Sequence, residues 1–189
     1  QYITYLAQSG LGLPDRDWYL STDDATHTQA RAAYMSYITS IMDLAGYARA
    51  ADTASSVMAI ENRIAVAHWD RVRNRQAELT YNKRTLAELN AMAPAIDWTA
   101  LMQGLGVTET TFVVNQPSFL EDLGKIWDEI PLQQWEDYFS YKFVDSLAPY
   151  LSKAFVDAQF DFEGRVLNGQ EANEPRWKRG VNSVDRSLG

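Results

Sequence analysis

The sequence predicts a mainly α-helical fold, a single multi-helix domain with one or two short strands near the beginning and the middle of the chain. Two observations predict it. Apolar residues recur every three or four positions through most of the 189 residues, which is the spacing of amphipathic helices. Residues that favour helix N-termini precede several of these stretches. No linker-like stretch divides the chain, so we expect roughly six to eight helices in one domain over residues 1–189.

The two expected strands lie far apart in the sequence. Polar and apolar side chains alternate from Gln1 to Leu6, and this alternation predicts a strand. No earlier strand is there to pair with it, which suggests that a segment before residue 1 has been removed. A second strand is predicted at 111–114, where Thr, Phe and two Val residues favour the extended conformation.

The stretch GLGLPDRDWYL, from Gly10 to Leu20, combines two glycines and a proline with a charged and aromatic cluster. It does not match a phosphate-binding loop, because the required Gly-Lys-Ser/Thr ending is missing and acidic side chains repel phosphate. We expect a structural corner instead. Gly10 and Gly12 can take positive φ, and Pro14 fixes the direction in which the backbone leaves the turn.

The second half of this stretch is expected to fasten the corner to its surroundings. Arg16 can pair with Asp15, with Asp17 or with a carboxylate from another segment. Trp18 and Tyr19 are expected to bury their rings against the helices.

Two long helices are predicted after the corner. Ser21 to Asp24 supply N-caps for the first, which ends near Gly46. The second runs from about Asp52 to Arg75, and its basic end suits a helix C-terminus. Their apolar stripes are Tyr34, Ile38, Ile41, Met42 and Ala45 in the first helix, and Val57, Ile60, Ile64 and Ala67 in the second.

Capping signals mark shorter helices in the middle of the chain. TYNKRTLAEL, residues 80–89, contains a capping box of Thr85 and Glu88, and the helix behind it runs to Met92. Asp97 caps another short helix.

The last third of the chain is also predicted to be helical. Ser118 and Glu121 repeat the capping box in front of a helix that runs to about Glu129. A longer helical region follows, and Pro149 is expected to kink or split it because proline removes a backbone hydrogen bond. A final amphipathic segment starts at Arg176.

The charge of the chain excludes several kinds of partner. The net charge is −8 and the pI is near 4.7, whereas nucleic acids and anionic membrane surfaces bind clustered Lys and Arg. We therefore expect neither partner. No apolar run approaches the roughly 18 residues that span a bilayer. There are no cysteines, so disulfides and thiolate chemistry are excluded.

The sequence predicts no catalytic, cofactor-binding or metal-binding residue within this chain. Of the two histidines, neither lies in an H-E-x-x-H motif; we expect His68 to be half-buried or at the surface with one hydrogen bond, and His27 to be solvated. No G-x-S-x-G motif exposes a serine. Neighbouring carboxylates lie on predicted polar faces, and the densest acidic group, Asp157, Asp161 and Glu163, lacks EF-hand spacing.

Three stretches in this order carry a resemblance to a known family: GLGLPDRDWYL, TYNKRTLAEL and the closing SKAFVDAQFDFEGRVLNG with PRWKRGVNSV. Together they resemble the neprilysin and endothelin-converting-enzyme family of zinc metallopeptidases, in its bacterial branch. The similarity extends from about Leu6 to Val184. Trp18 stands where the family commonly has Tyr, and Arg84 where it commonly has Met.

The resemblance implies a place for this chain in a larger two-lobed enzyme. One lobe of the family carries H-E-x-x-H, a downstream E-x-x-x-D and an N-A-Y/F-Y segment, and none of these motifs occurs here. The chain looks like the other lobe, a helical cap that closes over the active site, with residues 1–20 as its opening strand and corner loop. Its residues that match the family's structural motif are Gly10, Gly12, Pro14, Arg16, Asp17, Tyr81, Asn82 and Trp177.

Function follows from the resemblance as an expectation. The parent enzyme would be a zinc metalloendopeptidase that acts on short peptides in the periplasm or at the cell surface, with zinc bound by the missing catalytic lobe. This chain would limit substrate size by walling the chamber, and alone it would be inactive. The alternative is a non-enzymatic helical module that binds peptides or glycans through exposed Trp and Tyr; mostly buried aromatic side chains would remove its basis.

Overall fold

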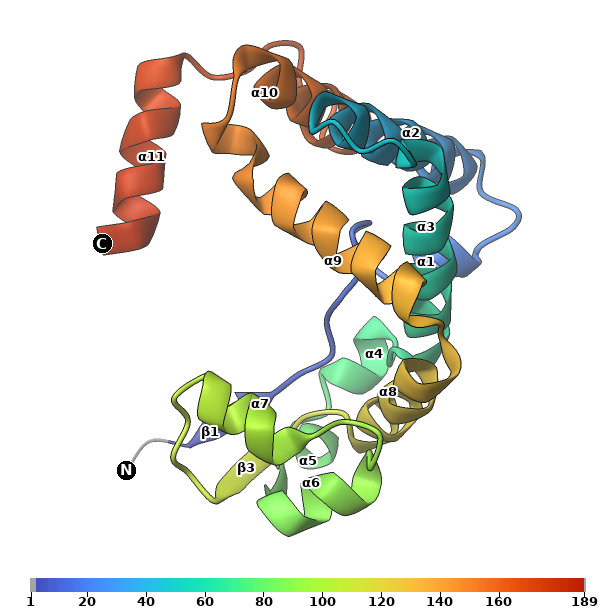
Figure 1. Ribbon diagram of the computed structural model, residues 1–189, viewed down its shortest axis with the longest axis vertical. Helices are drawn as coiled ribbons and strands as arrows, with labels where there is room; N and C mark the ends of the chain where they lie inside the picture. The colour runs from blue at the N-terminus through green and yellow to red at the C-terminus, as the bar shows by residue number, and fades with distance from the viewer. Residues whose placement is uncertain (1–2, 189) are drawn as a thin grey trace.

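The computed structural model describes residues 3–188, and within them the fold is mainly α, as predicted (Figure 1). The helices of this part are accompanied by a 3₁₀ turn, a π-helical segment and one three-stranded sheet. In the same described residues, no helix is both long enough and apolar enough to cross a membrane.

The first helices follow the corner. They are α1 (Asp17–Leu20), α2 (Ala25–Leu44) and α3 (Ala50–Ala67). Asp24 caps α2 as predicted, because its side chain accepts the backbone N–H groups of Thr26 and His27 at 2.7 and 3.1 Å.

The prediction that the second long helix reaches Arg75 was wrong. His68 has extended backbone and ends α3, and Asp70 then caps a separate short helix, α4 (Arg71–Asn74), by accepting from the N–H of Arg73 at 2.7 Å. The basic run therefore belongs to α4, and the N-cap signal at Asp70 outweighs the helix-favouring residues around it.

The sheet joins three short strands in the order β1-β3-β2. These are β1 (Thr4–Leu6), β2 (Asn82–Thr85) and β3 (Thr111–Val114), with β1 parallel and β2 antiparallel to β3. The partner of β1 lies later in the chain rather than before it. The first two residues of the predicted opening strand lie outside the described residues. The sequence prediction missed β2, because Asn-Lys-Arg-Thr has no apolar alternation.

Two short helices, α6 (Leu86–Met92) and α7 (Trp98–Gly104), pack with the sheet and form a second, smaller core. The short helix before β2, α5 (Ala77–Thr80), has no buried residue. The capping box of α6 is confirmed: Thr85 Oγ1 accepts from the N–H of Glu88, whose carboxylate accepts from the N–H of Thr85 at 2.7 Å. The buried residues of this core are Leu89, Ala93, Trp98, Met102, Phe112, Val114 and Leu120.

The remaining elements are α8 (Pro117–Glu129), α9 (Leu132–Leu147), the 3₁₀ turn η1 (Ala148–Tyr150), α10 (Lys153–Gln159), the π-helical η2 (Phe160–Leu167) and α11 (Arg176–Leu188). Pro149 interrupts the helical region as predicted. The prediction of a capping box at Ser118 and Glu121 was wrong, because Pro117 already occupies the first turn of α8. The Oγ of Ser118 instead accepts a hydrogen bond from Trp69 Nε1 at 2.7 Å.

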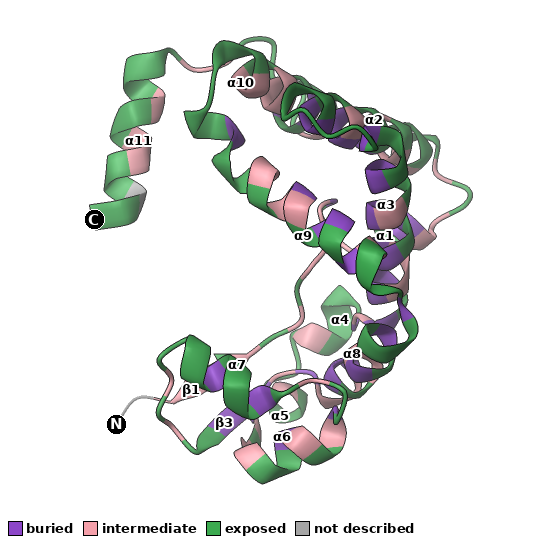
Figure 2. Ribbon diagram, in the orientation of Figure 1, coloured by how far each residue is buried: buried purple, intermediate pink, exposed green. Residues whose placement is uncertain are grey.

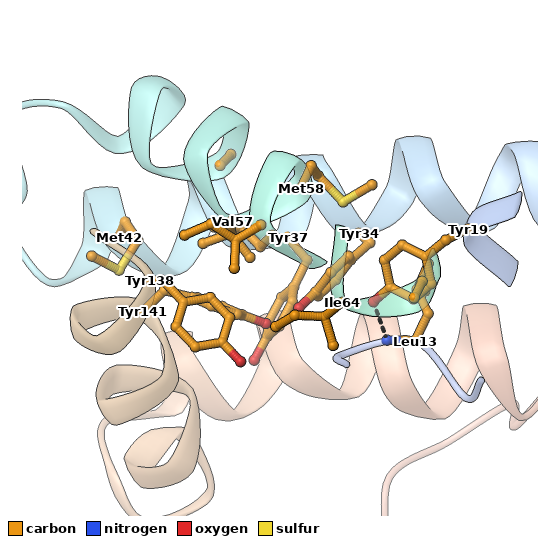
Figure 3. Close-up of a cluster of buried hydrophobic side chains, with 14 of the residues drawn as sticks. Leu13, Tyr19, Tyr34, Tyr37, Met42, Val57, Met58, Ile64, Tyr138 and Tyr141 are labelled. Atoms are coloured by element: carbon orange, nitrogen blue, oxygen red, sulfur yellow. Dashed lines mark hydrogen bonds between the residues drawn. The ribbon is translucent and has the colours of Figure 1, made fainter. Parts of the chain in front are cut away.

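The chain bends into a C (Figure 1). The sheet and α5–α7 form one arm, α2, α9 and α10 form the other, and α3 and α8 join them, while α11 stands apart near the open side. Buried residues concentrate on the facing sides of α2 and α3 (Figure 2). Tyrosines fill much of this main core; Tyr19, Tyr34, Tyr37, Tyr138 and Tyr141 are all buried (Figure 3).

Candidate functional site: the corner loop and the Glu61 network

The family-motif residues predicted from the sequence fall in three separate places. Five lie in the corner between β1 and the first turn of α1, two lie at the start of β2, and one lies on α11. They are Gly10, Gly12, Pro14, Arg16 and Asp17; Tyr81 and Asn82; and Trp177. The corner is the place where most of them meet other elements.

Gly10 makes the turn by conformation. Its φ is 106°, a left-handed value that side chains rarely allow. Its carbonyl accepts a hydrogen bond from the hydroxyl of Tyr138 at 2.7 Å, which ties the corner to α9.

Gly12 serves the corner through its small size, and the prediction of positive φ at this residue was wrong. A Cβ at this position would lie 1.8 Å from the hydroxyl oxygen of Tyr34, so no side chain fits. The backbone N–H of Gly12 faces the hydroxyl of Tyr19 at 3.0 Å and the carboxylate of Glu61 at 3.1 Å. The glycine therefore lets the backbone approach a buried polar cluster closely.

The expected ion pair of Arg16 is not formed within the described residues. Its Nε donates to the backbone carbonyl of Ala65 on α3 at 3.3 Å, while Asp15 pairs with Arg71 on α4. The side chain of Asp15 also accepts the N–H of Asp17 at 2.8 Å, which opens α1. The carbonyls near the end of α3 have no further helical turn to bond with, so they attract the guanidinium.

The aromatic residues of the corner pack as expected, in different degrees. Tyr19 is buried, and its hydroxyl accepts the N–H of Leu13 at 2.8 Å (Figure 3). Trp18 is half-buried and its ring lies 4.7 Å from that of His27. His27 is therefore partly covered by an aromatic ring, whereas the sequence predicted a solvated side chain.

Glu61 of α3 is the centre of this site, and it has no exposed surface. Its carboxylate accepts hydrogen bonds from the hydroxyls of Tyr19 at 2.5 Å and Tyr34 at 3.1 Å, and from the N–H of Gly12. Lys142 Nζ of α9 lies 2.6 Å from the same carboxylate. We call these five residues the Glu61 network. A buried carboxylate is tolerated when a counter-charge and hydrogen-bond donors surround it, and the network supplies both.

The tyrosines of the network are held as proton donors. Burial, and then the charge of Glu61, raise the pKa of Tyr34 well above its ordinary value of 10. The same two causes, in the same order, raise the pKa of Tyr19. Both hydroxyls keep their protons at neutral pH and donate to Glu61.

Sequence reasoning missed the Glu61 network, although one signal was present. Glu61 stands four residues after Val57 and three before Ile64, so it lies on the apolar stripe of α3. A charged residue within such a stripe needs a buried partner, but the partner on α9 is 81 residues away and no local pattern points to it.

The other motif residues have local roles. The side-chain amide of Asn82 donates to the carbonyls of Leu79 at 2.6 Å and Val114 at 3.1 Å, which fastens β2 to β3. Tyr81 is exposed, with Lys83 Nζ 5.7 Å from its ring centre. Trp177 is exposed on α11.

The described residues do not fit a zinc ion. Within residues 3–188, no three His, Cys, Asp or Glu side chains come together as a metal site. His68 is half-buried, as expected; its Nε2 lies 3.1 Å from the carbonyl of Ser9, and burial lowers its pKa below 6.5. The corner and the Glu61 network can thus position backbone and helices, but they offer no metal ligand set.

A family model described as peptidase family M13 matches residues 1–189. The chain belongs to peptidase family M13. The M13 chain is 29% identical to neprilysin-2 of Drosophila melanogaster over 82% of its length and 21% of that protein. The chain is also 26% identical to human endothelin-converting enzyme 1, and the alignment covers 99% of the chain and 25% of that enzyme. The resemblance seen in the sequence is thereby confirmed.

Solved structures are similar to this chain along its whole length. The open state of the zinc metalloprotease Zmp1 of Mycobacterium tuberculosis matches all of it with 34% identity and a TM-score of 0.93, and the chain covers 30% of Zmp1. The Zmp1 complex with an inhibitor gives the same TM-score and identity. The chain thus spans about a quarter of the curated relatives and corresponds to the helical N-terminal region of an M13 zinc metallopeptidase.

Proposed function

We propose that this chain forms the helical lobe of a zinc metalloendopeptidase that hydrolyses oligopeptides, and that it limits substrate size by walling the active-site chamber. The observation that carries the proposal is the match of the whole chain to Zmp1, at 34% identity and a TM-score of 0.93. Zmp1 is a zinc metalloprotease whose inhibitor complex matches equally well.

The fold supports a wall with a fixed shape. The Glu61 network joins the corner, α1, α2, α3 and α9 through buried contacts. Satisfied buried polar groups of this kind hold the surrounding elements in one arrangement. Helix α9 lies along the inner side of the C (Figure 1). Four of its apolar residues are exposed, Leu132, Phe139, Phe143 and Leu147, whereas Trp135, Tyr138 and Tyr141 are buried.

In this proposal, zinc and its ligands belong to parts of the polypeptide outside residues 1–189. No metal ligand set occurs within residues 3–188, and the contribution that we propose for this chain is steric. Its helices exclude folded or bulky substrates and admit flexible peptides. The location in the periplasm or at the cell surface is part of the same proposal.

The alternative, a helical module that binds peptides or glycans on an aromatic platform, has less support. Trp69, Trp98 and Trp135 are buried. The two most exposed tryptophans, Trp127 and Trp177, lie on different helices, α8 and α11. These two tryptophans therefore do not share one platform, although the ring of Trp127 lies 6.2 Å from that of Phe139, which is also exposed.

The test uses the complete M13 polypeptide and a set of peptides that share one scissile sequence and differ in added flexible length. We expect kcat/KM to fall at least about tenfold once the peptide exceeds the chamber, and we expect the same sequence within a folded protein to resist cleavage. A double variant, Phe139→Ala with Phe143→Ala, should shift this length dependence while the shortest peptide is cleaved as before. Equal kcat/KM at all lengths would contradict the steric role.

A further inference from the structure

Residues 71–84 are basic, although the chain as a whole is acidic. They hold five Lys or Arg and one Asp or Glu, whereas the whole chain has 17 and 25. The segment begins with α4, which lies on the inner side of the bend of the C, between the two arms (Figure 1). Local positive charge of this kind attracts anions to one part of an otherwise acidic chain.

Arg73 of α4 is exposed, and its guanidinium makes no ion pair within residues 3–188. Its neighbour Arg71 is already paired with Asp15, and Asp70 accepts the backbone N–H of Arg73 at 2.7 Å. The Cζ of Arg73 lies 3.6 Å from the centre of the Trp69 ring, so the guanidinium rests on the indole. An arginine supported through its flat face keeps its N–H groups available for bidentate hydrogen bonds to a carboxylate.

Trp69 is a fixed support for this guanidinium. It is buried, and its backbone N–H donates to the side-chain carbonyl of Gln8 at 2.8 Å. Its own carbonyl accepts from the side-chain amides of Gln8 at 3.0 Å and Asn74 at 3.1 Å, and its Nε1 donates to Ser118. The position of Arg73 is therefore set before a ligand arrives, which reduces the entropy lost on binding.

We propose that Arg73, supported by Trp69, binds the side-chain carboxylate of an Asp or Glu in oligopeptide substrates and so favours acidic peptides. This proposal rests on the proposed function, in which zinc is bound outside residues 1–189. The acidic residue would accordingly lie away from the scissile bond. A single free guanidinium suits one carboxylate, whereas nucleic acid or an anionic membrane needs clustered Lys and Arg.

The test measures peptide cleavage by the complete M13 polypeptide. The peptides share one scissile sequence and carry a single Glu or Gln at increasing distances from it. All are amidated at the C-terminus, which removes the terminal carboxylate as a second source of the same chemistry. We expect kcat/KM for the Glu peptide to exceed that of the Gln peptide about tenfold at one distance, mainly through KM, and we expect added salt to reduce this preference.

Variants of α4 assign the preference to one side chain. Arg73→Gln should bring the Glu and Gln peptides within about twofold of each other, and Arg73→Lys should keep only part of the preference, because lysine lacks the planar fork. Arg73→Glu should favour a Lys peptide over the Gln peptide at the same distance. Arg75→Gln is the matched control, since it removes an exposed positive charge next to the same short helix, and it should change the preference by less than about twofold. Circular dichroism checks that each variant is folded.

The possible results separate this site from other roles of Arg73. Equal kcat/KM for Glu and Gln peptides at every distance would overturn the proposal. It would also be overturned if Arg75→Gln removed the preference as fully as Arg73→Gln, which would indicate a general effect of charge. A lower melting temperature of Arg73→Gln with an unchanged preference would show that Arg73 pairs with a carboxylate of the polypeptide itself, and this result also contradicts the proposal.

Failure of the proposed function gives different results. Cleavage that does not depend on peptide length, together with a Glu preference that requires Arg73, would contradict the steric wall and support the Arg73 site. If no peptide is cleaved, the proposed function fails, and fluorescence anisotropy of labelled Glu and Gln peptides still measures binding. Equal Kd values for the two peptides would then overturn the Arg73 site, and tighter binding of the Glu peptide that is lost in Arg73→Gln would support it.

Discussion

Single residues decide how the corner meets the helices, and Glu61 is the clearest case. Its carboxylate lies in the core with donors from the corner, α1, α2 and α9 around it. Replacing such a group by an apolar one is often tolerated, whereas removing one partner leaves a buried charge without compensation. The arrangement therefore predicts unequal effects for the two ends of the Glu61–Lys142 pair.

Lys142→Met should lower the free energy of unfolding by about 3 kcal/mol, because Glu61 loses its counter-charge within the core. Urea denaturation measures this change. Lys125→Met is the matched control, since Lys125 forms an exposed pair with Asp122, and it should leave the urea midpoint nearly unchanged. The double variant Glu61→Gln with Lys142→Met should be more stable than Lys142→Met alone. A double variant that is less stable would show that the charge of Glu61 is not what destabilises the single variant.

Gly12→Ala should destabilise the protein by about 3 kcal/mol or more, since its Cβ would overlap the Tyr34 hydroxyl and disturb the Glu61 network. Gly104→Ala is the control: the space around Gly104 is open and it ends helix α7, so alanine should be neutral or slightly stabilising. Thermal unfolding of both variants measures the difference. Equal melting temperatures would mean that the corner adapts to a side chain.

His68 should make stability depend on pH. Burial lowers its pKa in the folded chain below 6.5, so the unfolded chain takes up a proton at higher pH than the folded chain. Its contribution to stability is therefore complete above pH 6.5 and is lost as the pH falls through the folded pKa. His68→Gln keeps a donor for the carbonyl of Ser9 and should reduce the slope of unfolding free energy against pH below 6.5. An unchanged slope would assign the pH dependence to other groups.

At the scale of helices and strands, the sequence was informative wherever a signal was local. Asp24, Asp97 and the box of Thr85 and Glu88 each cap the helix that they were expected to cap. Errors arose where two local signals competed, as at Pro117 and Ser118, or where a strand had no apolar alternation, as in β2. The pairing of β1 with β3 and of Glu61 with Lys142 depends on residues far apart in the chain, and no short pattern contains it.

Thr85→Ala tests one of these local signals. The variant loses the side chain that accepts the N–H of Glu88 at the start of α6, and it should lower the free energy of unfolding by about 1 kcal/mol. Thr80→Ala is a suitable comparison, since the Thr80 hydroxyl bonds only to carbonyls of its own turn and caps no helix. Similar losses for both variants would indicate that the cap adds little beyond helix propensity.

At the scale of the whole molecule, the distribution of function between this chain and the rest of an M13 polypeptide can be tested by metal binding. Residues 1–189, incubated with zinc and passed through gel filtration, should retain well under one zinc ion per chain and should not cleave a quenched peptide. The complete polypeptide should retain about one zinc ion and lose its activity with a chelator. Histidine variants serve as controls: His27→Ala and His68→Ala should leave zinc content unchanged in the complete polypeptide, because one imidazole packs on Trp18 and the other bonds to Ser9. Stoichiometric zinc in residues 1–189 would place a metal site within this chain and would remove the basis for a purely steric wall.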